Sequence, residues 1–201
     1  MRLFLLLALA LPVWAQEPKI LVIGDSISIG YTPFVTAALK GKATVVHNEG
    51  NAAHTRNGVA KIDEWLGDTK WDVIHFNFGL HDLKIMEDGK HQVPLEEYAE
   101  NRHAIIQRLK QTKAKLIWAS TTPVPPGKIS PLRQPADVPK FNAVAARMMQ
   151  LEKIPINDLF SADQSGQLPA NVHYTPAGYQ ALAQQVLKVL PQGPPASSSA
   201  L

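Results

Sequence analysis

The chain contains no cysteine among its 201 residues. Disulfide bonds, a thiol nucleophile and cysteine-ligated metal are therefore all excluded. The seven histidines show neither an H-x-x-x-H pair nor a repeated spacing with carboxylates, so we expect no catalytic metal and no cofactor. Basic residues form no run and the formal net charge is only +3, so the sequence does not indicate a basic surface that would bind nucleic acid.

Long apolar runs are also scarce, and the one at the N-terminus is too short to cross a bilayer. Arg2 precedes the apolar run Leu3–Leu11, and Val13-Trp14-Ala15 fits a small-x-small cleavage site. This pattern predicts a signal peptide over residues 1–15 and an exported protein, either secreted or periplasmic. The alternative is a buried first helix. We expect no membrane span in the mature chain.

The remainder predicts one domain over residues 16–191, followed by a disordered, low-complexity tail over 192–201. Apolar segments alternate with helical patterns, which favours an α/β fold with helices on both faces of a mostly parallel, five-stranded sheet. We expect Thr32 and Thr175 to cap the first and last helices. The expected strands cover 20–23, 43–47, 71–78, 115–119 and 154–156, and the expected helices 32–39, 58–66, 94–110, 138–151 and 175–189.

The stretch Lys19–Tyr31, KILVIGDSISIGY, reads as a buried strand that ends abruptly at Gly24-Asp25-Ser26. A serine at the carboxyl edge of a parallel sheet can act as a nucleophile if another segment brings a base to it. His173, close to the other end of the chain, is the best candidate base. The alternative reading of Ser26 is a helix N-cap.

Polar residues gather in four loops that the topology should bring to one edge of the sheet. Acyl transfer needs a nucleophile, a base and hydrogen-bond donors for the developing oxyanion. Backbone N–H groups at Ser26 and Gly50 and the side chain of His81 are the candidate donors. The proline-rich loop 121–136 is long enough to lie on the substrate side. The four loops are Gly24-Asp25-Ser26, Asn48-Glu49-Gly50-Asn51, Gly79-Leu80-His81-Asp82 and Ala170-Asn171-Val172-His173.

The order of these blocks resembles the SGNH (GDSL-type) hydrolase superfamily. The resemblance rests on Gly24-Asp25-Ser26, Gly50, Gly79-x-x-Asp82 and His173, and it covers Lys19 to about Leu190. It implies a three-layer α/β/α, flavodoxin-like fold and hydrolysis of esters, often of acetyl groups on carbohydrates. The rival G-x-S-x-G pattern is absent, because Gly24-Asp25-Ser26-Ile27-Ser28 lacks the final glycine.

Two positions depart from the superfamily pattern. His81 stands where asparagine is usual, and it can still donate one N–H if it has the correct tautomer. Ala170 stands where the superfamily places the aspartate that orients the base, three residues before His173. Three outcomes are open: a backbone carbonyl holds the His173 ring, another acid does so, with Asp82 as the first choice, or the enzyme is weakened or dead.

Asp25 and Asp82 are both more typical of structural support than of catalysis. The sequence thus predicts an exported serine esterase that hydrolyses short-chain esters, acetyl esters first, of a small molecule or a carbohydrate. The alternative from another class is a non-catalytic carbohydrate-binding or interaction protein on the same scaffold, which the alanine at position 170 favours. A lipase or thioesterase is the third interpretation.

Overall fold

The computed structural model describes residues 17–193, so the predicted signal peptide and most of the predicted tail lie outside the described residues. A single five-stranded sheet with the order β2-β1-β3-β4-β5 forms its centre, and every adjacent pair of strands is parallel. The strands are β1 (Lys19–Ile23), β2 (Thr44–His47), β3 (Val73–Phe76), β4 (Lys115–Ala119) and β5 (Ile156–Asn157).

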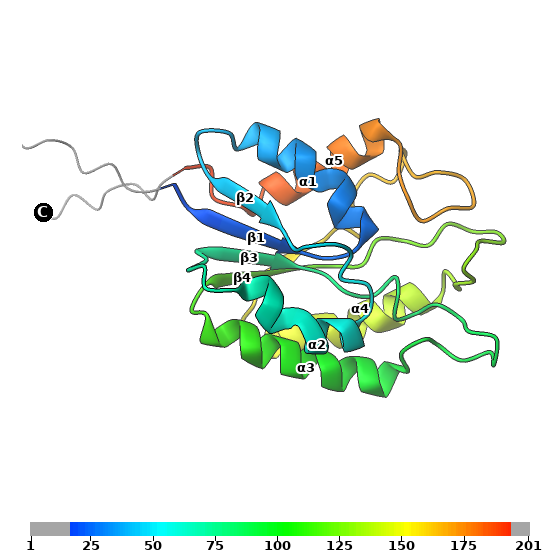
Figure 1. Ribbon diagram of the computed structural model, residues 1–201. Helices are drawn as coiled ribbons and strands as arrows, with labels where there is room; N and C mark the ends of the chain where they lie inside the picture. The colour runs from blue at the N-terminus through cyan, green and yellow to red at the C-terminus, as the bar shows by residue number, and fades with distance from the viewer. Residues whose placement is uncertain (1–16, 194–201) are drawn as a thin grey trace, which may run out of the picture.

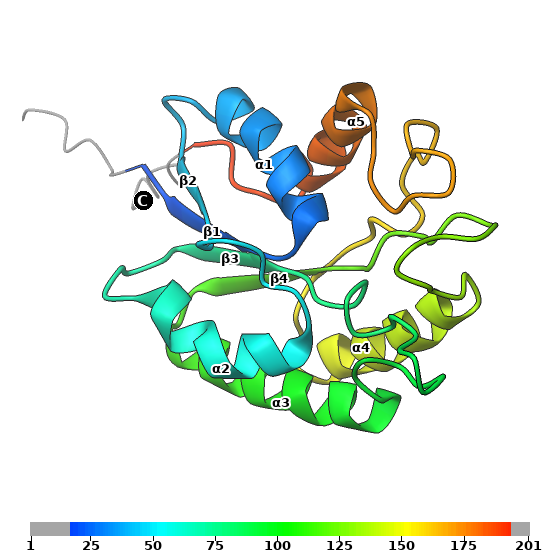
Figure 2. The same cartoon turned by 45° about the vertical axis from the view of Figure 1, so that its right-hand side comes forward.

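Five helices cover the two faces of this sheet. Figures 1 and 2 show α1 and α5 packed together on one face and α2, α3 and α4 on the other. The predicted three-layer α/β fold is confirmed. The helices are α1 (Ser26–Ala38), α2 (Thr55–Leu66), α3 (Leu95–Gln111), α4 (Asp137–Leu151) and α5 (Pro176–Leu187). None of the helices between residues 17 and 193 has the length and apolar character that a membrane crossing requires.

The core lies on both sides of the sheet, which explains the continuous apolar runs of the strands. In β1, Ile20, Leu21, Val22 and Ile23 are each at most 1% exposed, so neither face of this strand meets solvent. Parallel sheets covered by helices on both faces have this pattern rather than a polar–apolar alternation.

Helix α1 begins earlier than the sequence pattern indicated. We expected Thr32 to cap a helix that starts at Pro33, but the helix begins at Ser26 and runs through Pro33. The cap is Asp25, whose Oδ1 accepts a hydrogen bond from the N–H of Ile27 at 3.0 Å. The helix buries one face, including Tyr31 and Val35, on either side of the proline. Packing therefore outweighs the local stop signal that Thr-Pro gives.

Helix α2 and strand β5 also begin at residues other than those predicted. Helix α2 starts three residues earlier than expected because His54 caps it: Nδ1 of His54 accepts from the N–H of Asn57 at 3.2 Å. Strand β5 lies two residues later than its predicted start and is only two residues long. The prediction that Thr175 caps the last helix is confirmed, since its Oγ1 accepts from the N–H of Gly178.

Candidate active site

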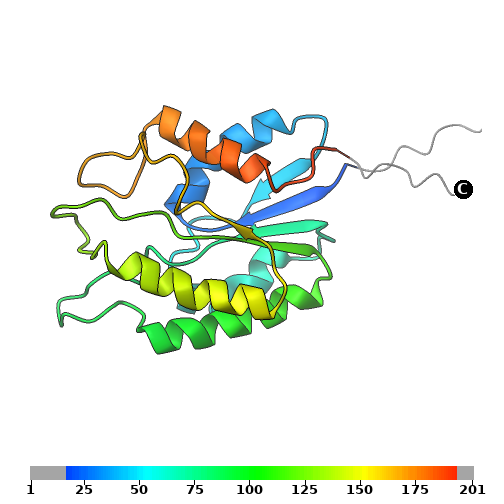
Figure 3. The same ribbon diagram turned by 180° about the vertical axis from the view of Figure 1, so that it is seen from behind.

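The four polar loops do meet at one edge, beyond the carboxyl ends of the strands (Figure 3). Strand β1 ends at Ile23, and Ser26 follows as the first residue of α1. Because β2 lies on one side of β1 and β3 on the other, this loop sits where the strand order reverses. Ligands of open α/β sheets bind in the crevice at such a point.

The predicted nucleophile and base are in contact. Nε2 of His173 lies 2.8 Å from Oγ of Ser26, although 147 residues separate them in the sequence. Ser26 is placed by the start of α1, and His173 by the loop that leads into α5. A hydroxyl and an imidazole at this distance satisfy the geometric requirement for general-base activation.

The ring of His173 is held by the side chain of Asn171. Oδ1 of Asn171 accepts from the backbone N–H of His173 at 3.1 Å and lies 2.7 Å from Nδ1 of the same residue. A backbone N–H only donates, so the atom facing it is the amide oxygen, and Nδ1 of His173 must carry the proton. In the neutral ring, Nε2 is then the nitrogen without a proton, and it can accept the hydroxyl proton of Ser26.

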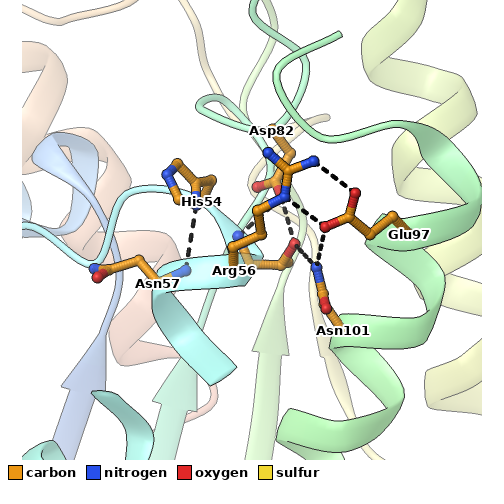
Figure 4. A network of polar contacts seen from close by, with 7 residues as sticks. His54, Arg56, Asn57, Asp82, Glu97 and Asn101 are labelled. Carbon is orange, nitrogen blue, oxygen red and sulfur yellow. Dashed lines mark hydrogen bonds and ion pairs between the residues drawn. The ribbon is translucent and has the colours of Figure 1, made fainter. Parts of the chain in front are cut away.

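Asp82 does not hold His173, contrary to the first choice for a replacement acid. Its Oδ1 accepts from the N–H of Thr55 at 2.8 Å and from the Thr55 hydroxyl at 2.6 Å (Figure 4). Its carboxylate thereby ties the third polar loop to the start of α2. Burial raises the pKa of Asp82 to about 6, against the lowering effect of the Thr55 hydrogen bonds. Asp82 is thus a structural support in this geometry.

The sequence pattern assigns no role to Asn171, because the superfamily has its aspartate three residues before the base histidine, at the position of Ala170. A side chain two residues before the base was the available signal, because an Asx residue commonly hydrogen-bonds its own backbone two residues on.

His81 has the tautomer that an oxyanion donor needs. Nζ of Lys84 donates to Nδ1 of His81 at 3.0 Å. An ammonium has only donors, so Nδ1 accepts and the ring proton sits on Nε2. The pKa of His81 is lowered to about 3, mainly by burial and further by the nearby charges of Lys84 and Arg133. The ring is therefore neutral near pH 7, with one N–H available on Nε2.

Gly50 is not among the residues that line the pocket at Ser26, and its carbonyl accepts from Nδ2 of Asn48. Asn51 is the residue of this loop that reaches the pocket. Its Oδ1 accepts from the N–H of Ala53 at 2.8 Å, which leaves both N–H donors of Nδ2 available. Asn48 has a different task that the sequence did not reveal: its Oδ1 accepts from the N–H of Gly24 at 2.9 Å and joins the first two loops.

Asp25 lies beneath the site rather than in it. It is 2% exposed and caps α1, as its structural interpretation predicted. Burial raises its pKa, while the Ile27 hydrogen bond and the charges of Arg133, His173 and Lys84 act in the opposite direction. No three His, Asp or Glu side chains gather as metal ligands anywhere in residues 17–193.

A small pocket adjoins the serine and the histidine, with a volume of about 270 Å³. This volume is just below the range common for drug-sized ligands, so the pocket suits a small group. The proline-rich loop lies on its wall, where a substrate-side loop was expected. The lining residues come from five segments: Ser26; Asn51; Leu80, His81 and Lys84; Ile129, Ser130, Pro131 and Arg133; and Asn171, Val172 and His173.

Several solved structures share this fold. An acetyl xylan esterase, AlAXEase, has a TM-score of 0.71 at 14% identity, with 86% of this chain and 99% of that chain covered. A mutant acetyl-xylooligosaccharide esterase from Geobacillus has a TM-score of 0.70 at 19% identity, covering 87% and 94%. A lipase/acylhydrolase from Enterococcus faecalis has a TM-score of 0.68 at 20% identity, covering 86% and 94%. At these identities the likeness shows the fold alone.

The fold and the polar edge define a doubly wound α/β protein with a serine–histidine pair at its switch point. The sequence model of the GDSL-like Lipase/Acylhydrolase family matches residues 22–181, and the chain belongs to this family. Membership supports an esterase or acylhydrolase activity in general. A search among curated proteins gave no match.

Proposed function

We propose that this protein is a serine esterase in which Ser26 and His173 carry the chemistry. The observation that carries the proposal is the 2.8 Å contact between Oγ of Ser26 and Nε2 of His173, whose Nδ1 is held by Asn171. Oγ attacks the ester carbonyl carbon while its proton moves to Nε2. The tetrahedral intermediate collapses, Nε2–H protonates the departing alcohol, and an acyl-serine remains. Water then attacks the acyl carbon, gives its proton to Nε2, and releases the carboxylic acid as Ser26 regains its proton.

The oxyanion is stabilised by N–H groups from three loops. The backbone N–H of Ser26 lies at the first turn of α1, where helix N–H groups lack intrahelical partners and the helix dipole favours negative charge. His81 supplies Nε2–H, and Asn51 supplies Nδ2–H in place of the donor expected from Gly50. Losing one such donor in another serine enzyme costs about 10²–10³ in turnover.

Asn171 orients the base without supplying a charge. An aspartate in this position would fix the same tautomer and also stabilise the imidazolium that forms when His173 takes the proton. Asn171 performs the first task only. The proposed enzyme is therefore active but slower than one with a complete triad.

The proposed substrates are esters of short acyl chains, acetyl esters first, including those on carbohydrates. The pocket of about 270 Å³ beside Ser26 supports a small acyl group, and two of the similar structures carry the names of acetyl esterases. We also propose export, on the basis of Arg2 and the apolar run Leu3–Leu11. Terminal sequencing of the protein recovered outside the cytoplasm of an expressing bacterium should start at Gln16; an intact Met1 there would contradict cleavage.

Hydrolysis of 4-nitrophenyl acetate by the mature protein tests the proposed activity. We expect turnover that disappears in Ser26→Ala and in His173→Ala, but persists in the matched controls Ser165→Ala and His103→Ala, two exposed residues away from the pocket. A parent protein no faster than Ser26→Ala on esters of several acyl lengths would refute the esterase and favour the non-catalytic binding protein. Better turnover of long-chain esters than of acetate would favour a lipase.

A further inference from the structure

Two positively charged side chains line the pocket beside Ser26 without a carboxylate partner. They are Lys84, from the third polar loop, and Arg133, from the proline-rich loop. Within residues 17–193 neither lies within 4.0 Å of an acidic side chain, whereas several exposed cations of the same chain, such as Arg56 and Lys110, have ion-pair partners. Lys84 and Arg133 thus bring positive charge to the pocket without an ion pair to a carboxylate.

Arg133 is held rigidly in this position. It is 4% exposed, its Nε donates to the carbonyl of Leu80 at 2.6 Å, and its Nη1 donates to the carbonyl of Pro131 at 3.2 Å. Its Nη2 makes no hydrogen bond with any described residue. Taking a guanidinium out of water without an ion-pair partner is costly, and burial accordingly lowers the pKa of Arg133, while the charge of Asp25 acts in the opposite direction. An anion arriving in the pocket would offset that cost.

Lys84 adds a second cation with donors to spare. Its Nζ uses one proton for Nδ1 of His81, and an ammonium has three. Burial and the charge of Arg133 lower the pKa of Lys84, while the charges of Asp25 and Asp82 act in the opposite direction, so the two cations lie close enough to affect each other. Neither of these buried acids forms an ion pair with the two cations: Oδ1 of Asp25 accepts from the N–H of Ile27, and Oδ1 of Asp82 accepts from Thr55.

We propose that the pocket selects esters that carry a negative charge close to the scissile bond, with Lys84 and Arg133 as the residues that bind it. This proposal rests on the esterase function proposed above. The anionic group is a carboxylate, phosphate or sulfate, on either the acyl or the alcohol part of the ester. Charge-assisted hydrogen bonds to such groups are shorter and roughly twice as strong as neutral ones.

Two matched substrate pairs test the proposal and tell the acyl side from the alcohol side. For the alcohol side, kcat/KM is measured on 4-acetoxybenzoate and on neutral 4-acetoxybenzamide. For the acyl side, it is measured on the 4-nitrophenyl monoester of adipic acid and on its neutral, methyl-capped diester. The quantity compared is the ratio of kcat/KM for the anionic ester to that for its neutral partner, corrected for the uncatalysed rates.

The variant that isolates the charge is Lys84→Gln, because glutamine keeps an N–H donor for Nδ1 of His81 while removing the positive charge. We expect the parent to prefer the anionic ester in one pair, and Lys84→Gln to reduce that ratio about tenfold. Arg133→Gln should reduce it as well, with its melting temperature and its rate on the neutral ester reporting whether it folds. Lys90→Gln, an exposed lysine outside the pocket, should leave the ratio unchanged.

Each remaining outcome decides the proposal. Hydrolysis of neutral esters with no anionic preference in either pair would overturn charge selection and leave the esterase standing. A Lys84→Gln variant that slows both members of a pair equally would also overturn it, because the cation would then serve only the oxyanion. Rates no better than those of Ser26→Ala on all four esters would refute the esterase and the selection together.

Discussion

Oδ1 of Asn171 lies 2.7 Å from Nδ1 of His173 and also accepts the backbone N–H of the same residue. The imidazole thus has a fixed orientation and a fixed tautomer although no carboxylate in residues 17–193 is hydrogen-bonded to it. In trypsin-like serine proteases, replacing the acid by asparagine lowers turnover about 10⁴-fold because the tautomer becomes wrong. Here the backbone N–H of His173 holds the amide oxygen of Asn171 toward Nδ1 of the ring, so the wrong tautomer is not formed.

Restoring the charge should therefore raise the rate. We expect Asn171→Asp to increase kcat on 4-nitrophenyl acetate by about tenfold, because the carboxylate stabilises the imidazolium in the transition state. Asn171→Ala should lower kcat, since Nδ1 of the ring then loses its side-chain partner. Ala170→Asp is the matched comparison: it places the acid at the superfamily position, but Nδ1 is already engaged, so the rate should change little. A larger gain from Ala170→Asp than from Asn171→Asp would contradict the role of Asn171.

The tautomer of His81 gives a second prediction. His81→Ala should lower kcat about 10²-fold, the loss expected when one oxyanion donor is removed. His81→Asn should recover most of that rate, because an amide N–H replaces Nε2–H. Lys84→Met, which removes the proton donor to Nδ1, should reduce kcat more than Lys84→Gln does. Equal rates in His81→Ala and the parent would remove His81 from the oxyanion site.

Asp82 should affect stability more than catalysis. Asp82→Ala leaves the N–H and hydroxyl of Thr55 without their buried acceptor, and we expect a loss of about 2 kcal/mol in the free energy of unfolding. The kcat of the folded variant should stay within a few-fold of the parent. Chemical denaturation and initial rates, measured on Asp82→Ala and Asp82→Asn, check this. A folded Asp82→Asn variant whose turnover falls a thousandfold would show that the carboxylate takes part in the reaction.

Buried His75 should make stability depend on pH. It is 0% exposed, its Nε2 accepts from Nδ2 of Asn157 at 3.0 Å, and burial lowers its pKa to about 4. In the unfolded chain, His75 takes up a proton near the ordinary pKa of 6.5. The contribution of His75 to the free energy of unfolding is therefore complete above that pH and is lost as pH falls toward 4. The full effect is about 3 kcal/mol.

Asp82 acts in the opposite direction over part of the same range. Its pKa is raised to about 6, so its stabilising contribution is present at low pH and is lost as pH rises through 6. The test therefore compares the parent with a variant that lacks His75, so that the effect of Asp82 cancels. The free energy of unfolding of the parent minus that of His75→Phe should shrink as pH falls from 7 to 4, and a constant difference would refute the titration of His75.

Much of the molecule follows from short-range sequence signals. Apolar runs bounded by glycine and polar loops marked the strands, and their alternation with helical patterns required a parallel sheet covered on both faces. Because parallel strands end at one edge, the polar loops had to meet there. The presence of Ser26 and His173 at the same edge, predicted from opposite ends of the chain, follows from this topology.

The tertiary structure decided which side chains touch within that edge. Asn171 holds His173, Asp82 is bonded to Thr55, and Asn51 reaches the pocket where Gly50 does not. These outcomes depend on loop backbone angles and on hydrogen bonds between segments far apart in sequence, which no periodicity encodes. The start of α1 at Ser26 was decided in the same way, because packing on the sheet and α5 outweighs the local signal of Thr32 and Pro33.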